Sequence, residues 1–143
     1  MRKILFALVL ALPMAAFAQQ SPVGTWTTVD DETGKPKSIV EISQAADGGL
    51  VGTVAEVLQS DQGPDPVCGK CTGERKDQPI EGMQIIWDVT QKGDSWTGGK
   101  ILDPASGKTY SVKMQTTDNG NKLEVRGFMG FSLLGRTQVW ERR

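Results

Sequence analysis

Two cysteines, Cys68 and Cys71, are the residues whose type and spacing most directly indicate chemistry in this 143-residue chain. A Cys-x-x-Cys pair can be a redox-active disulfide, half of a metal site, or a clip that closes a small loop. Thioredoxin-like chemistry needs the first cysteine at the start of a helix, and no helical pattern follows Cys71. A tetrahedral zinc site needs two more ligands, but the sequence holds no other cysteine and no histidine. We therefore expect a structural disulfide, and neither a metal nor a cofactor.

The N-terminus indicates where such a disulfide would form. Residues 1–18 combine a basic start, an apolar run and the cleavage pattern Ala16-Phe17-Ala18, which together are typical of a secretory signal peptide. The apolar run is too short to span a membrane, and no second run of that kind follows. With no cysteine at the cleavage site to carry a lipid anchor, we predict a periplasmic or secreted protein with one domain, residues 19–143. Disulfides persist in that environment.

Composition makes several classes of function improbable. Without Arg2 and Lys3, the 16 basic residues fall to 14 against 17 acidic ones, a net charge of −3. The charges are interspersed, so we expect no nucleic-acid partner and no anionic membrane surface as partner. The absence of histidine removes the commonest general base and the usual Ser-His and Cys-His pairs. An enzyme is therefore disfavoured; it would have to work with carboxylates, lysine, tyrosine or the two cysteines, and a carboxylate-dependent hydrolase is one example.

Short runs of alternating apolar residues, separated by turn residues, indicate an all-β domain. The expected strands cover residues 23–29, 37–44, 50–58, 82–89, 95–102, 108–115, 122–128 and 131–141. In the fourth strand we expect Met83, Ile85, Trp87 and Val89 to share one face. Eight antiparallel strands of this length close most economically into an up-and-down barrel, which removes exposed edges. A two-sheet β-sandwich is the alternative.

One connection, residues 59–81, is far longer than the others and has the cysteine pair at its centre. Loops of this length are usually functional or disordered, and the cysteines indicate that this one is held in shape. Its charged stretch Glu74-Arg75-Lys76-Asp77 is either a solvated turn or a recognition surface at the mouth of a barrel. Strand aromatics that point inward, with Trp87 and Tyr110 as candidates, could line a small apolar cavity.

The first and last strands of a closed barrel are neighbours, which brings their residues together. Gly24-Thr25-Trp26 opens the first strand, and Arg136 and Arg142 lie on the last one. An indole that plugs one end of the barrel, with an arginine guanidinium stacked over it, would seal that end. We therefore expect Gly24, Trp26 and either Arg136 or Arg142 to form a plug.

Several segments resemble the uncharacterised secreted bacterial family numbered 2147 among the domains of unknown function. They are residues 68–83 (CGKCTGERKDQPIEGM), 96–104 (WTGGKILDP), 107–110 (GKTY), 125–130 (VRGFMG) and 133–140 (LLGRTQVW). With the Gly-x-Trp opening, the resemblance covers nearly all of residues 22–142. It implies a lipocalin-like barrel, in which Gly-x-Trp and a C-terminal arginine form the closed end. It implies no activity and carries over no ligand residues.

Three functions follow as hypotheses. The leading one is an exported barrel that binds a hydrophobic or amphipathic small molecule, with residues 59–81 as a flap near its mouth. The second is an interaction module of the cell envelope that has a packed barrel and binds an unknown protein partner through the long loop. The third is the carboxylate-dependent hydrolase.

Overall fold

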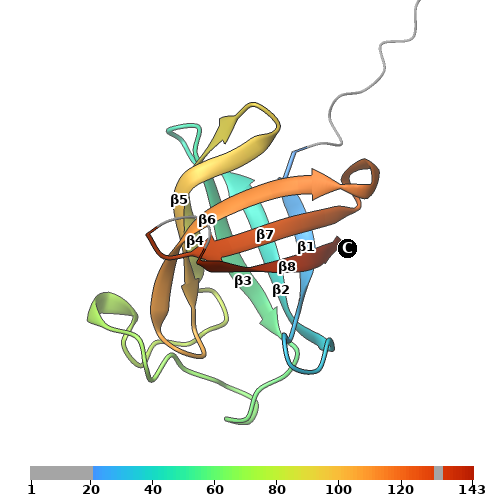
Figure 1. The fold of residues 1–143 in the computed structure, drawn as a ribbon. Coiled ribbons are helices and arrows are strands. Elements are labelled where there is room, and N and C mark those ends of the chain that lie inside the picture. Colours follow the sequence, from blue (N-terminus) through green and yellow to red (C-terminus); the bar gives the residue numbers. More distant parts are fainter. Residues whose placement is uncertain (1–20, 131–133) are drawn as a thin grey trace, which may run out of the picture.

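The computed structural model describes residues 21–130 and 134–143, and these residues contain eight strands. The strands are β1 (Gly24–Val29), β2 (Pro36–Gln44), β3 (Leu50–Val57), β4 (Gln84–Lys92), β5 (Ser95–Asp103), β6 (Lys108–Thr117), β7 (Lys122–Phe128) and β8 (Gly135–Arg142). Each pairs antiparallel with the next, and β8 pairs with β1, so the sheet closes into a barrel (Figure 1). The expected up-and-down barrel is confirmed. A sandwich would leave β1 and β8 unpaired with each other, so that alternative is set aside.

Two parts of the sequence-based expectations lie outside the described residues. They are the signal peptide, residues 1–18, and residues 131–133 at the start of the last expected strand. Within the described ranges, no helix is long and apolar enough to cross a membrane.

The two ends of the barrel differ, and we name each by one residue. The Asp31 end carries the β1–β2 turn, the long loop between β3 and β4, and the β5–β6 turn, and it is the lower end in Figure 1. The Trp26 end carries the β4–β5 hairpin and the β6–β7 turn η3 (Asp118–Gly120).

The interior towards the Trp26 end is filled by apolar side chains. Trp26, Val40 and Val54 are paired in register across β1, β2 and β3, and Met114 and Leu123 come from the opposite wall. All five are at most 2 % exposed. Side chains around a ligand-sized cavity would retain accessible surface, so this half of the barrel is packed rather than hollow.

Strand β4 departs from simple alternation at a bulge. From Leu50↔Val89 to Gly52↔Ile86, β4 holds one residue more than β3, and Asp88 in this bulge has a positive φ of 58°. Both Ile86 and Val89 consequently face the core. The expectation that Trp87 and Val89 share a face is therefore wrong, because the bulge leaves Trp87 on the outer wall.

The long loop folds as a small hairpin of its own. Val67 bridges Pro79, the Cys68 N–H donates to the Gln78 carbonyl (2.8 Å), and the Ile80 N–H donates to the Pro66 carbonyl (3.0 Å). It contacts the outer wall of β4, the β5–β6 turn and the end of β3, where the Val57 N–H donates to the Glu81 carboxylate (2.9 Å). The loop thus packs against the outside of the barrel and runs along its lower end in Figure 1.

Candidate functional site

The disulfide between Cys68 and Cys71 is present, as expected, with a Cα–Cα separation of 5.3 Å. Both side chains are buried, and the Cys68 Sγ lies 3.4 Å from the Pro104 carbonyl oxygen of the β5–β6 turn. The 3-10 turn η2 (Gly73–Arg75) begins after the pair and does not contain it. A buried disulfide without a helix at its first cysteine fits a clip that docks the loop, because a redox partner must reach the sulfur it attacks.

The charged stretch of the loop is used mainly to hold the loop in place. The Arg75 guanidinium stacks 4.6 Å from the Trp87 ring centroid, and Arg75 Nε donates to the Gln84 carbonyl (3.2 Å). Lys76 Nζ lies 3.7 Å from the Asp77 carboxylate and also donates to a carbonyl of the loop. Glu74 is exposed on η2. Trp87 was one of the two aromatic residues expected to line a cavity. It lies instead on the outer wall of the barrel, where it contacts the loop through Arg75.

At the Trp26 end, Arg142 stacks on the Trp26 indole, with its guanidinium carbon 4.3 Å from the ring centroid. Its three nitrogens also donate to the carbonyls of Gly120 (2.7 Å), Val23 (2.9 Å) and Ser21 (3.0 Å). The planar fork of the guanidinium makes this possible, since it presents donors in several fixed directions while its face rests on the ring.

Of the other two residues expected in the plug, Gly24 lies against Arg142 and Arg136 does not. Gly24 has a φ of +144°, and a Cβ there would overlap the guanidinium of Arg142. Arg136 does not reach this end: β8 pairs Arg142 with Trp26, and Arg136 stands six residues earlier on the strand, about 20 Å away. The assignment of Arg136 to the plug is therefore corrected.

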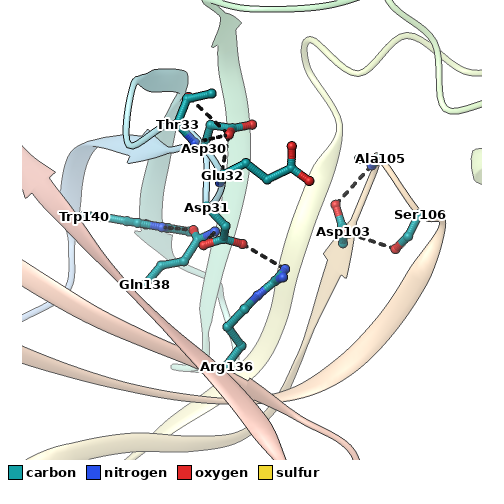
Figure 2. A network of polar contacts seen from close by, with 10 residues as sticks. All are labelled: Asp30, Asp31, Glu32, Thr33, Asp103, Ala105, Ser106, Arg136, Gln138 and Trp140. Atoms are coloured by element: carbon teal, nitrogen blue, oxygen red, sulfur yellow. Dashed lines mark hydrogen bonds and ion pairs between the residues drawn. The ribbon is translucent and has the colours of Figure 1, made fainter.

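At the other end, Arg136 belongs to a polar network that the sequence did not reveal (Figure 2). Arg136 Nη2 lies 2.8 Å from Asp31 Oδ2, and Gln138 Nε2 donates to Asp31 Oδ1 at 2.8 Å. The Trp140 indole N–H donates to Gln138 Oε1 (2.9 Å), which ties the network to a buried side chain. Asp31 and its partners on β8 are far apart in the sequence, so no local motif could have predicted the network.

The network spans a gap in the seam between the first and last strands. β1 and β8 are registered only at Trp26↔Arg142 and Thr27↔Glu141, near the Trp26 end. Towards the Asp31 end the β1–β2 turn reaches β8 through the Asp31 side chain instead of through a backbone ladder. This end of the barrel therefore relies on side chains for closure.

Four neighbouring strands place a row of residues on the inner wall at the Asp31 end. Ile101 of β5 faces Tyr110 of β6, and Gly127 of β7 faces Arg136 of β8. A Cβ on Gly127 would lie 3.5 Å from the Tyr110 Cβ and 3.8 Å from the Ile101 Cγ2, so the row is continuous. Ile101, Tyr110 and Gly127 are half-buried and Arg136 is exposed, so the row is open to solvent.

Below this row the barrel is filled. Val112 follows Tyr110 on the inner face of β6, and Val112, Met114 and Ile86 are at most 1 % exposed. Among the described residues, the Asp31 end is therefore a partly polar surface with an apolar wall that lies over a packed interior.

The comparisons with known proteins agree with this fold. Residues 24–142 match the model of a family described as "Uncharacterized protein conserved in bacteria (DUF2147)". A solved structure described as "Protein HP1028 from the human pathogen Helicobacter pylori belongs to the lipocalin family" is similar, with a TM-score of 0.72 and 22% sequence identity. The likeness covers 85% of this chain and 82% of that one, and at this identity it speaks for the fold alone. No curated protein matches the chain.

Proposed function

This chain belongs to the uncharacterised bacterial family DUF2147, and we propose that its lipocalin-like barrel binds a small amphipathic molecule with an acidic head group at the Asp31 end. The row Ile101, Tyr110, Gly127 and Arg136 carries this proposal. It joins an apolar wall, a stretch of backbone without a side chain and an exposed cation in one solvent-accessible line.

Each member of the row suits one part of such a ligand. An acyl or ring portion would pack on Ile101 and Tyr110 and pass over Gly127, where the missing side chain leaves room. A carboxylate would accept from Arg136, whose guanidinium uses Nη2 for Asp31 and keeps further donors for a second anion. The packed interior limits the ligand to a small molecule that sits in the mouth of the barrel.

The place of action is part of the proposal. A signal peptide at residues 1–18 would deliver the domain from about residue 19 to the periplasm or the exterior. The disulfide of the loop is compatible with such an oxidising compartment.

Octanoate binding, followed at Tyr110, tests the proposed site. Tyr110 is the single tyrosine of the chain, so protein labelled with fluorotyrosine gives one ¹⁹F resonance that reports on the row. We expect octanoate to shift this resonance saturably. Octanol and octylammonium, which share its chain length, should bind at least about tenfold more weakly, because a charge-assisted hydrogen bond is lost.

Three variants locate the binding. Arg136→Gln should weaken the binding of octanoate by about tenfold. Gly127→Val should block it, because the added side chain fills the row without backbone strain. Arg126→Gln removes a cation from the outer face of the adjacent strand, where Arg126 contacts Thr137, and should leave octanoate binding unchanged. Equal binding of all three probes, or an unmoved resonance, would refute the proposal.

A second candidate, an interaction module of the cell envelope, is favoured by the packed interior and by the docking of the long loop on the outer wall. It requires a protein partner that contacts residues 59–81. Crosslinking in intact cells should then yield a discrete complex that is lost when residues 59–81 are replaced by a short turn and kept when Arg136 is changed. Loss of the complex only in the Arg136 variant would exclude this candidate.

A further inference from the structure

A recess lies at the opposite end of the barrel from the row described above. It has a volume of about 290 Å³ and lies between the β4–β5 hairpin and the end of β6 with η3. Its lining is mostly polar and includes one aromatic residue, Trp96; the other lining residues are Gln91, Asp94, Gln115, Thr116, Thr117, Asn119 and Gly120. This volume is near the lower limit of ligand pockets, which range over roughly 300–1,000 Å³, so it fits one small molecule.

The recess exists because β6 is longer than its partner. The register between β5 and β6 ends at Trp96↔Met114, whereas β6 continues to Thr117 and is paired there with β7 alone. Gln91 is registered with Trp96, so the amide stands on the same face as the indole. The strand mismatch thus leaves a notch with Trp96 in its lining.

The far side of the notch is held in a fixed conformation. Asp118 and Asn119 both have positive φ values, 52° and 53°, and Gly120 follows with 85°. The Gly120 carbonyl accepts from Arg142 Nε at 2.7 Å, which ties this turn to the residue that stacks on Trp26. Asn119 therefore lies in a turn that is hydrogen-bonded to Arg142 through the neighbouring Gly120 carbonyl.

The polar groups around Trp96 have capacity for a ligand. In the described part of the chain, the side chains of Asp94, Gln115 and Asn119 make no hydrogen bond to another residue. Gln91 donates from Nε2 to the Gly93 carbonyl (3.3 Å) and keeps its own carbonyl oxygen. Amides and a carboxylate together offer both donors and acceptors.

We infer that this recess binds one neutral monosaccharide unit, with a face of the sugar ring on the Trp96 indole and its hydroxyl groups on the surrounding side chains. The C–H face of a pyranose is an apolar surface that suits an aromatic ring, whereas its hydroxyls both donate and accept hydrogen bonds. The lining contains no basic residue and one acidic residue, Asp94, among the described positions. An anionic ligand therefore finds no counter-charge there.

A titration with glucose, galactose and N-acetylglucosamine tests this inference on the whole exported chain. The chain has four tryptophans, so fluorotryptophan labelling gives four ¹⁹F resonances, and Trp96→Phe assigns the one that matters. We expect at least one sugar to shift the Trp96 resonance saturably at concentrations up to about 50 mM, above the millimolar dissociation constants usual for weak sites. Glycerol, which lacks a ring, should leave it in place.

Variants at the recess decide whether the sugar binds there. Trp96→Leu should weaken sugar binding by about tenfold or more; because this variant lacks the Trp96 resonance, its binding is followed on the sugar itself by saturation-transfer NMR, with the wild type measured in the same way. Asn119→Gly tolerates the positive φ at this position, and it should weaken sugar binding several-fold because the side-chain amide is lost. Trp87→Leu on the outer wall is the matched control and should bind normally. The unchanged Tyr110 resonance shows that each variant is folded.

Three results would overturn the inference. They are the absence of any sugar-induced shift, a sugar response that survives both recess variants, and saturable binding of choline in place of every sugar. The last would identify a site for an organic cation on Trp96 and Asp94. The inference is independent of the proposed function, because octanoate is followed at Tyr110 and sugars at Trp96, so each can fail alone.

Discussion

The Arg136 guanidinium lies 2.8 Å from the Asp31 carboxylate, across the part of the barrel seam that has no backbone pairing between β1 and β8. The pair joins the first turn of the described domain to its last strand. Gln138 supports the same carboxylate from two residues further along β8. Closure of the barrel at this end thus depends on Asp31 as a shared acceptor.

Asp31→Asn should loosen this seam without unfolding the protein. Because the Arg136 side chain is 70% exposed, the ion pair contributes no more than about 1 kcal/mol to the free energy of unfolding. The local effect is larger: amide hydrogen exchange in residues 30–35 should accelerate relative to wild type. Glu32→Gln, an exposed acid in the same turn, is the control and should exchange normally. Unchanged exchange in the Asn variant would show that the turn is held by the backbone alone.

Trp26→Ala should be the most destabilising single change at the Trp26 end. The indole is fully buried, and its N–H donates to the Pro22 carbonyl at 2.8 Å. Loss of such a side chain costs about 3–5 kcal/mol, which urea denaturation measures directly. A loss under about 1 kcal/mol would show that the surrounding wall closes without the indole.

Arg142→Lys should destabilise the same end although the charge is kept. A lysine cannot reach three carbonyls while it lies flat on the Trp26 ring, so we expect a loss of about 1–3 kcal/mol. Arg143→Lys, at the exposed next position, should change the free energy of unfolding by less than about 0.5 kcal/mol. Equal effects of the two substitutions would mean that the fork geometry does not matter.

Gly107→Ala should lower the free energy of unfolding more than Gly34→Ala does. The difference measures how firmly the long loop is docked on the β5–β6 turn. Both glycines have almost the same φ, 72° and 69°. A Cβ on Gly34 meets nothing, whereas one on Gly107 overlaps the Lys70 carbonyl. We expect a loss of about 1 kcal/mol at Gly34 from backbone strain, and at least about 1 kcal/mol more at Gly107 from the overlap. Thermal or urea unfolding of both variants gives the comparison, and equal losses would show that the loop moves aside freely.

Removal of the disulfide should cost about 2 kcal/mol by the chain-entropy estimate for so small a loop. Cys68→Ser/Cys71→Ser and the reduced wild type should both lose this amount, as followed by urea denaturation. Hydrogen exchange should accelerate in residues 66–82, because the loop is docked through Cys68 on the Pro104 carbonyl. Thiol titration of the unreduced, denatured protein should find no free thiol. Two free thiols, or equal stability with and without reductant, would contradict the clip.

Asp30 should contribute stability that is lost in acid. The hydrogen bond from the Thr33 N–H has the largest effect on this carboxylate; together with weaker contributions from the Glu32 N–H, the Thr33 hydroxyl and the charge of Lys37, it holds the pKa of Asp30 below the ordinary 3.8 against the opposing effect of desolvation. A depressed folded-state pKa means that the contribution is present above the unfolded value and disappears as the pH falls through the folded one. Carboxyl NMR should therefore give Asp30 a midpoint below 3.8. Asp30→Asn should flatten the acid limb of the stability profile, and a midpoint at or above 3.8 would contradict the capping role of this side chain.

The sequence by itself determined the all-β class, the approximate extent of the strands, the long loop and its disulfide. Alternation, turn residues and cysteine spacing are local signals, and local signals specify which segments are extended and where they end. Gly24 and Trp26 could be assigned to one end of the barrel because β1 and β8 must meet when an up-and-down sheet closes.

Only the tertiary structure decided which residues meet across the barrel. The register of β8 against β1 places Arg142 on Trp26 and sends Arg136 to Asp31, and a shift of two residues along the strand would have changed both contacts. The bulge at Asp88 moved Trp87 to the outer wall, a change that alternation in the sequence cannot express. Strand register and bulges depend on long-range pairing, whereas strand identity depends on neighbours along the chain.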